Sequence, residues 1–227
     1  MPVVGISTSR KAKGARYIRV MEKVGAEPVI LRPHPEADIS SIIDSVDGLL
    51  LSGGEDIDPH YYEEPFLDAT PDKERDAFEM PLLKAALDRD MPVFGVCRGM
   101  EALNVVMGGK LTRNIKGHRS ADLVKSAFHD VYIAPGSRLG AIFGGAPILR
   151  VNSRHHQGFT QSQKARGLLA SAYVLDGDLI EAVESLEHTW VFGVQWHPER
   201  ESENHPKNLN LFHSLAEAAE RFAKIAV

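Results

Sequence analysis

The single cysteine of the chain lies in the pentapeptide Gly95-Val96-Cys97-Arg98-Gly99, between an apolar run and a helical pattern. A nucleophile between glycines at a strand-to-helix turn is typical of a nucleophile elbow. The sharp turn leaves no room for flanking side chains, and it pushes the sulfur outward. The N-terminus of the following helix favours a negative charge on that sulfur. A lone cysteine is usually a small buried hydrophobe, but this context predicts a thiolate nucleophile.

A thiolate nucleophile needs a base and a group that orients the base. His197 and Glu199 lie two residues apart at the end of an apolar run, so both side chains can point the same way. Glu199 can then accept the imidazole N–H and fix the tautomer. The roles of these residues predict a Cys97-His197-Glu199 triad.

An oxyanion hole needs backbone N–H donors that point at the developing negative charge. The amide of Arg98 directly follows the nucleophile and is the natural first donor. Gly53 or Gly54, at the end of the apolar run 48–51, is a candidate for the second. This position fits a binding role, because ligands of open α/β sheets bind at the carboxyl ends of strands. A glycine pair is also compatible with a plain turn.

The elements that must position these residues alternate in the first half of the chain. Apolar runs predict strands at 3–6, 28–31, 48–51 and 92–96, and helical spacing predicts helices at 15–24, 39–43, 74–89 and 98–107. Asp38 is a candidate N-cap of the second helix, and Pro81 should bend or restart the third. This alternation predicts a parallel sheet with helices on both faces.

The second half has a different pattern. It predicts strands at 123–134, 148–152, 168–175, 179–184 and 190–195, and a last helix at 206–224. We expect these strands to form a more antiparallel region appended to the parallel core. The polar segment 55–72 predicts a long loop. No repeat or linker interrupts residues 1–227, so we expect one domain.

Composition excludes several classes of protein. The chain has 227 residues, a formal net charge of −5 and 43% hydrophobic residues, which argues against a strongly basic nucleic-acid binder and against disorder. One cysteine excludes an intrachain disulfide and a multi-cysteine metal site. The sequence has neither a targeting signal nor an apolar run of membrane-spanning length, so we expect a cytoplasmic protein that does not bind membranes.

Together these motifs resemble the class I glutamine amidotransferase superfamily, and most closely its free-standing γ-glutamyl-γ-aminobutyrate hydrolase-like cysteine peptidases. The resemblance covers most of the chain. It rests on segments 53–65, 75–79, 92–99, 104–109, 151–157, 176–184 and 194–199. It implies a flavodoxin-like parallel-core sheet with helices on both faces and an appended antiparallel region.

The resemblance also implies roles for individual residues. Cys97 would be the nucleophile, His197 the base and Glu199 its orienting group, with the amides of Gly54 and Arg98 as the oxyanion hole. The residues expected to bind substrate are Gly53, Glu101, Asn152, Ser153, His155, His156 and Gln157. The implied reaction is hydrolysis of a small γ-glutamyl amine through a thioester, which needs no metal and no organic cofactor.

Glu101 departs from the family pattern, which has glutamine at this position. It lies one helical turn from Cys97 and faces nearly the same site. Its carboxylate could bind a substrate ammonium group or pair with Arg98, and an unpaired charge there would disfavour the thiolate. The residue therefore leaves the identity of the acyl group open.

Three alternatives remain open from the sequence. The chain could be a glutamine amidotransferase subunit that supplies ammonia to a separate synthase. It could be a metal-dependent hydrolase that uses His155, His156, His197 and Glu199, or a binding module with an inactive site. For the preferred interpretation the partner is a small-molecule γ-glutamyl substrate, and a homodimer is possible.

Overall fold

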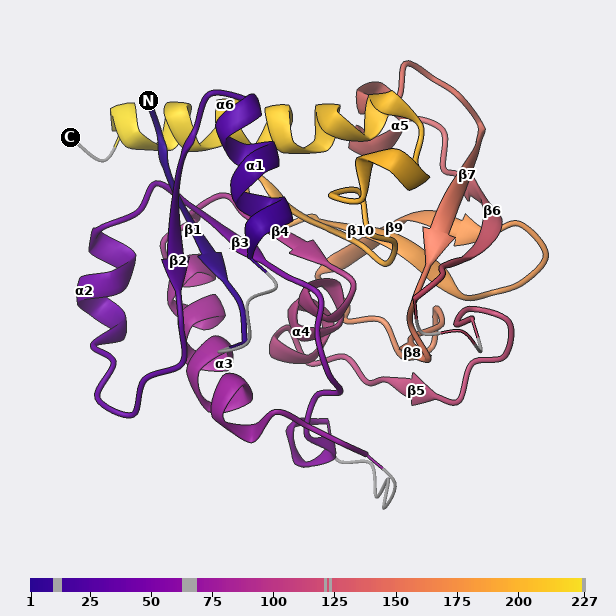
Figure 1. Ribbon diagram of the computed structural model, residues 1–227, viewed down its shortest axis with the longest axis horizontal. Coiled ribbons are helices and arrows are strands. Elements are labelled where there is room, and N and C mark those ends of the chain that lie inside the picture. The colour runs from indigo at the N-terminus through magenta and orange to yellow at the C-terminus, as the bar shows by residue number, and fades with distance from the viewer. Residues whose placement is uncertain (10–13, 63–68, 121, 123, 226–227) are drawn as a thin grey trace.

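A computed structural model describes residues 1–9, 14–62, 69–120, 122 and 124–225 of the chain (Figure 1). Residues 63–65 of the family motif, residues 10–13 between the first strand and the first helix, and the expected strand start at 123 lie outside the described residues.

One nine-stranded sheet forms the centre of the protein. Its strands, in spatial order, are β2 (Glu27–Leu31), β1 (Val3–Ser7), β3 (Gly48–Leu51), β4 (Val93–Val96), β11 (Val191–Val194), β10 (Ile180–Ser185), β9 (Leu168–Val174), β6 (Ala127–Ile133) and β7 (Ile148–Ser153). The first five strands pair in parallel, in the order of a flavodoxin-like fold. The last four are antiparallel, so the expected fold class is confirmed.

The expectation that the run 190–195 belongs to the antiparallel region holds for only one edge of this strand, β11, which pairs antiparallel with β10. β11 pairs in parallel with β4, and the two strands have the same sequence, Val-Phe-Gly-Val, with Phe94 opposite Phe192 and Gly95 opposite Gly193. All residues of both strands are buried, as is typical of central parallel strands. The ends of β4 and β11 therefore lie side by side.

Helices cover both faces of the sheet. They are α1 (Ala15–Lys23), α2 (Ile39–Asp44), α3 (Lys73–Asp88), α4 (Arg98–Val106), α5 (Arg138–Ile142) and α6 (Leu209–Ile225). One apolar cluster joins α1, α5 and α6 to one face of the sheet. A second joins α2, α3 and α4 to the other face, with Leu49 and Leu51 of β3 pointing into it and Leu50 into the first.

Several boundaries differ from the sequence predictions. The 123–134 strand is shorter, because β6 begins at Ala127. The last helix is split into a 3₁₀ turn, Pro206–Asn208, followed by α6. α5 was not predicted, because its five residues are too short for a helical period to be recognised. A short pair, β5 (Thr112–Arg113) with β8 (Gln157–Gly158), was also not predicted.

Pro81 does not restart α3, which runs through it without interruption. The proline is exposed, so the carbonyl that loses its partner there can bond water instead. Asp38 caps α2 as expected, accepting hydrogen bonds from the amides of Ser40 and Ser41. None of the described helices combines the length and apolar character that a bilayer-spanning segment needs.

Candidate active site

The turn between β4 and α4 has the geometry of an elbow at Cys97. Cys97 has φ 52° and ψ −108°, and its amide donates to the carbonyl of Val194 at 2.8 Å. A Cβ on Gly95 would lie 2.5 Å from the carbonyl of Gly99, and a Cβ on Gly99 would lie 2.3 Å from the carbonyl oxygen of Leu51. The backbone segments are in contact at both positions, which explains both glycines of the motif.

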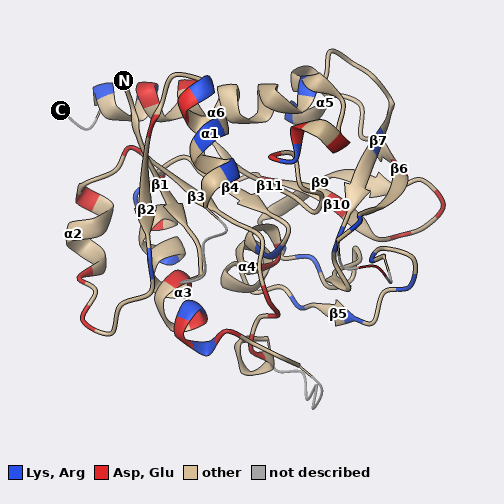
Figure 2. Ribbon diagram, in the orientation of Figure 1, with Lys and Arg blue, Asp and Glu red and all other residues tan. Residues whose placement is uncertain are grey.

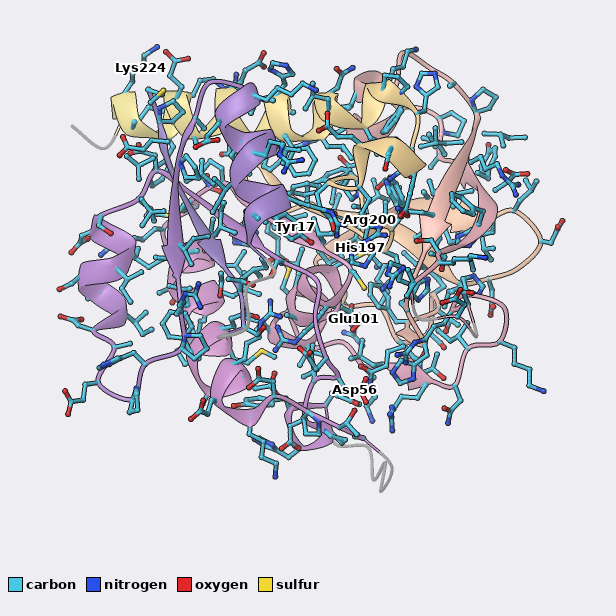
Figure 3. The ribbon with its side chains drawn as sticks, viewed as in Figure 1. Tyr17, Asp56, Glu101, His197, Arg200 and Lys224 are labelled. Atoms are coloured by element: carbon cyan, nitrogen blue, oxygen red, sulfur yellow. The ribbon has the colours of Figure 1, made fainter. Side chains whose placement is uncertain are left out.

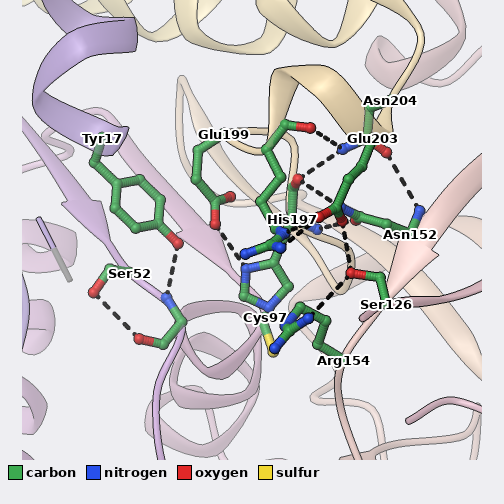
Figure 4. Close-up of polar contacts among 12 residues, drawn as sticks. Tyr17, Ser52, Cys97, Ser126, Asn152, Arg154, His197, Glu199, Glu203 and Asn204 are labelled. Atoms are coloured by element: carbon green, nitrogen blue, oxygen red, sulfur yellow. Dashed lines mark hydrogen bonds and ion pairs between the residues drawn. The ribbon is translucent and has the colours of Figure 1, made fainter. Parts of the chain in front are cut away.

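The residues after β11 place an imidazole beside this elbow (Figure 4). His197 Nδ1 lies 2.8 Å from Glu199 Oε1, so Nδ1 carries the proton and Nε2 is left for another partner. Asn152 fixes the backbone of His197: its Oδ1 accepts from the His197 amide at 2.9 Å and its Nδ2 donates to the carbonyl at 3.2 Å. Asn204 Nδ2 donates to the same carbonyl at 2.7 Å.

The charges around His197 favour its protonated form. Burial lowers the pKa of His197, but the charges of Glu199 and Cys97 outweigh it and raise the pKa to about 10. The ring is therefore held as an imidazolium next to a negative partner. Such an ion can donate a proton to a leaving group.

Tyr17 on α1 was not among the predicted site residues. Its hydroxyl accepts a hydrogen bond from the Gly53 amide at 3.1 Å, and burial and the charge of Glu199 raise its pKa well above the usual value. The helical period predicted that Ile18, Met21 and Val24 face the core, and it could not show that the buried face of α1 also carries a hydroxyl to the site. Figure 3 shows Tyr17 close to His197.

A buried arginine on α3 supports the segment 52–54. Arg75 donates to the carbonyls of Ser52 at 2.8 Å and Gly53 at 3.0 Å, and its Nε donates to Glu79 at 2.8 Å. A Cβ on Gly54 would lie 2.1 Å from Arg75 Nη1. Because the Gly53 amide is already bonded to Tyr17, the amide of Gly54 is the better candidate for an oxyanion donor.

The side chain of Arg98 belongs to the same buried network. It pairs with Asp76 and Glu79, and the side chains of all three residues are at most 1% exposed. Burial opposes ionisation of Glu79, but the charges of Arg75 and Arg98 outweigh it and lower the pKa. In the sequence, this network corresponds to charged residues of α3 that lie among its buried apolar ones. No functional role was predicted for these residues from the sequence.

Glu101 does not pair with Arg98, contrary to one of the two expectations. It accepts a hydrogen bond from Gln195 Nε2 at 2.8 Å, and the same nitrogen lies 3.7 Å from Cys97 Sγ. Burial raises the pKa of Glu101 against the opposing effect of this hydrogen bond. Arg98 is unavailable because it is already bound to two acids of α3.

The predicted substrate residues separate into two groups. His155, His156, Gln157 and Glu101 line a small cavity of about 190 Å³ next to Cys97, and Gly53 lines a larger one. Asn152 and Ser153 line neither, contrary to the prediction, because they end β7 with both side chains buried. Asn152 holds His197 instead, and Ser153 donates to the carbonyl of His118.

The larger cavity, of about 620 Å³, opens over the elbow and is strongly basic. Its lining includes Cys97, His197 and Glu199 together with Arg16, Arg19, Arg119, Lys125, Arg154 and Arg200. Figure 2 shows basic positions on α1 and beyond the end of β7, on two sides of this region. An overall acidic protein thus has a cationic site.

The four residues proposed for a metal-dependent hydrolase do not converge. His156 bonds Asp56 at 2.8 Å and His197 bonds Glu199, while His155 faces Glu181. Within the described residues, the one group arranged to hold a metal ion is His118, His155 and Glu181. This alternative is therefore not supported in the form that the sequence suggested.

Sequence relatives of this chain carry two kinds of name. The chain is 37% identical over 219 residues to a Mycobacterium tuberculosis protein whose name marks it as a candidate glutamine amidotransferase; the match covers 92% of this chain and 68% of that protein. It is 30% identical over 242 residues to gamma-glutamyl-gamma-aminobutyrate hydrolase of Escherichia coli (strain K12), covering 96% and 94%.

Among solved structures, the glutaminase domain of Trypanosoma brucei CTPS with bound acivicin has a TM-score of 0.70 at 17% identity, covering 97% of this chain and 94% of that one. This likeness concerns the fold. The family model described as peptidase C26 matches residues 2–199. The chain therefore belongs to the peptidase C26 family, which has the class I glutamine amidotransferase-like fold.

Proposed function

We propose that this protein is a cysteine-dependent hydrolase that cleaves the γ-glutamyl amide bond of a small, anionic γ-glutamyl amine. The observation that carries the proposal is the meeting of the Cys97 elbow and the His197-Glu199 pair in one basic cavity. Membership of peptidase C26 supports a hydrolase, and one relative is named for γ-glutamyl-γ-aminobutyrate.

The proposed reaction has two steps. The Cys97 thiolate attacks the γ-carbonyl carbon, and the amides of Gly54 and Arg98 donate to the resulting oxyanion. The C–N bond breaks as His197 Nε2 gives its proton to the departing nitrogen, which leaves a thioester and a free amine. Water then attacks the thioester, His197 takes its proton, and the C–S bond breaks to release glutamate and the thiolate.

The two cavities suggest which end of the substrate binds where. The smaller cavity carries Glu101 for an ammonium group and Arg119 and Arg154 for a carboxylate, which suits the glutamyl end. The larger cavity is rich in arginine and suits a leaving amine that carries its own negative charge. An aminobutyrate fits this requirement, whereas a diamine would place a cation against the arginines.

The test is amine release by the isolated protein from three substrates: γ-glutamyl-γ-aminobutyrate, a γ-glutamyl diamine of similar length, and glutamine. We expect the first to be cleaved fastest, and Cys97→Ala to reduce its cleavage by about 10³-fold or more. Arg16→Met should reduce the preference for the anionic amine over the diamine. Arg221→Met, which changes a side chain 61% exposed on α6, should not alter this preference. Release that survives Cys97→Ala would overturn the mechanism.

The second candidate is a glutaminase subunit that supplies ammonia to a separate synthase. The names of several relatives favour it. Glu101, in place of the usual glutamine beside the nucleophile, argues against it. Release of ammonia from glutamine alone, without cleavage of the other two substrates, would favour this candidate over the hydrolase.

A further inference from the structure

Three histidines surround a buried carboxylate behind the smaller cavity. Glu181, on β10, is fully buried, and its Oε1 lies 3.2 Å from His129 Nε2, 3.6 Å from His155 Nε2 and 3.8 Å from His118 Nε2. The rings pack together, with centroids 4.6 Å apart for His118 and His129, and 5.0 Å apart for His118 and His155. Neither proposed reaction step uses any of these four residues.

The protons of two of the rings are fixed by the backbone. His118 Nδ1 lies 3.1 Å from the carbonyl of Lys116, and His155 Nδ1 lies 2.7 Å from the carbonyl of Gln157. A carbonyl only accepts, so each Nδ1 must carry hydrogen, and each neutral ring presents a lone pair on Nε2 toward Glu181. Metal-binding histidines are commonly oriented in this way, by donation from the second ring nitrogen.

The converging atoms lack hydrogen bonds. Among the residues that the structure describes, Nε2 of His118, His129 and His155 and both carboxylate oxygens of Glu181 have no hydrogen-bond partner. A buried carboxylate that makes no well-aligned hydrogen bond is costly, and lone pairs of neutral rings directed at it add repulsion. A cation between them would satisfy Nε2 of His118, Nε2 of His155 and one oxygen of Glu181.

The spacing also fits a metal ion. Ligand atoms from His118, His155 and Glu181 all lie within 4.8 Å of one another. Zinc–ligand distances of about 2.0–2.1 Å place tetrahedral ligands roughly 3.4 Å apart, close to the separations from Glu181 given above. Nitrogen and carboxylate donors in this combination suit first-row divalent transition ions.

We propose that His118, His155 and Glu181 bind a divalent transition-metal ion, with His129 beside the carboxylate to hold it in place. The ion would fix the segment that carries His118 against β10. The next residue, Arg119, lines both cavities over the elbow, so the ion would position a side chain at the substrate site without touching the reacting atoms.

Zinc binding by the full chain tests the proposal. The protein is stripped with a chelator, titrated with Zn²⁺ against a chromophoric competitor, and separately loaded with Co²⁺ to record the visible absorption of the bound ion. We expect about one ion per chain and a Co²⁺ spectrum typical of low-coordinate nitrogen and oxygen ligation. Glu181→Gln and His118→Gln should each weaken Zn²⁺ binding by about 100-fold or more.

Two controls separate this site from other causes. His213→Gln removes an exposed histidine of α6 and should leave Zn²⁺ affinity unchanged. Cys97→Ala should also bind Zn²⁺ with wild-type affinity. The metal site and the hydrolase mechanism are therefore tested independently of each other. Circular dichroism verifies that each variant is folded; His118 lies in a loop with its side chain 14% exposed, so its variant should fold even if Glu181→Gln does not.

The proposal is overturned if the folded wild type binds no Zn²⁺ at concentrations up to about 1 mM, a limit far weaker than protein zinc sites. It is also overturned if His118→Gln binds as tightly as the wild type. In either case the charge of Glu181 would be balanced by a protonated histidine of the cluster instead.

Discussion

At the scale of single residues, the site is defined by how neighbouring charges set the protonation of one imidazole. Glu199 and Cys97 hold His197 in its charged form against the effect of burial. Glu101 lines the smaller cavity together with Cys97 and is bonded to Gln195. We therefore expect different effects from changing these two acids: Glu199 should affect the pKa of His197, and Glu101 should affect substrate affinity.

The pKa of His197 predicts an alkaline limit to activity. If the imidazolium is the proton donor, kcat/KM should fall as pH rises through about 10, where His197 loses its proton. Glu199→Gln removes the largest effect that raises this pKa, so the alkaline limb should move to lower pH. The measurement is a pH profile of amine release; Glu201→Gln, an exposed acid nearby, is the control and should leave the limb in place.

The same shift has a consequence for stability. The folded-state pKa lies above the value of about 6.5 for an unfolded histidine, so the ion pair stabilises the fold fully below that pH. The contribution is lost as pH rises through about 10. The test is the pH dependence of the free energy of unfolding between the unfolded and folded pKa values of His197. If Glu199→Gln kept the dependence of the wild type in this range, the charge coupling between Glu199 and His197 would be contradicted.

Glu101 should act on substrate affinity. If its carboxylate binds the glutamyl ammonium, Glu101→Gln should raise KM by about tenfold, as expected for loss of a charge-assisted hydrogen bond, with little change in kcat. The amide oxygen of the substituted side chain can still accept the hydrogen bond from Gln195. A glutaryl amide, which lacks the ammonium group, is the control substrate and should show no change of KM; equal effects on both substrates would contradict the assignment.

At the scale of elements, two features position Cys97: the close contact of β4 with α4 at the elbow, and the charged network that joins α3 to α4. The first is a local backbone feature. The second connects Arg98 to Asp76 and Glu79 on another helix.

Gly95→Ala tests the elbow. The new Cβ would lie 2.5 Å from the backbone of Gly99, and backbone cannot move as a side chain can. We expect a loss of about 3 kcal/mol or more in the free energy of unfolding by urea, at the upper end of overpacking effects. Gly140→Ala in α5 is the control: its nearest neighbour is a side chain at 3.3 Å, and the gain in helix propensity should make it neutral or slightly stabilising.

Arg98→Met tests the buried network. It leaves two carboxylates of α3 in the interior with one fewer cation, and we expect a loss of about 3–5 kcal/mol in unfolding free energy. Arg89→Met is the matched control, because its pair with Asp44 has side chains 42% and 60% exposed and is worth about 0–1 kcal/mol. Similar losses in both variants would mean that the network does not stabilise α3 against α4.

The difference between these two features explains how much could be predicted from the sequence. The elbow was predictable because its glycines and cysteine are adjacent in the chain and the turn is local. The network was not, because Arg98 meets its partners only after α3 and α4 pack together. Asn152 and Ser153 were assigned to the substrate for a similar reason: the motif identifies the segment, but only the path of β7 shows that these two side chains face the interior.

At the scale of the whole molecule, charge is distributed unevenly. The net charge is −5, yet the larger cavity contains six arginine and lysine side chains. Attraction of anions is therefore a property of the site and not of the protein as a whole. Fields of this kind act over about one Debye length, roughly 10 Å at 0.1 M salt.

Ionic strength should therefore affect substrates differently. We expect kcat/KM for γ-glutamyl-γ-aminobutyrate to fall by about tenfold between low and high salt, because screening weakens the attraction of its net negative charge. Glutamine, with no net charge, should show little change and is the control. The measurement is initial rates across a sodium chloride series, and parallel falls for both substrates would contradict steering by the cavity.

The position of β11 has a consequence for how the protein becomes active during synthesis. This strand, near the end of the chain, lies between β4 and β10 in the middle of the sheet. A ribosome that has released only the first 190 residues has therefore made Cys97 but not His197, and the two halves of the sheet lack the strand that pairs with both of them. On the proposed mechanism, the sulfur of Cys97 would remain without its base until this strand is in place, so assembly of the sheet and acquisition of reactivity would be one event.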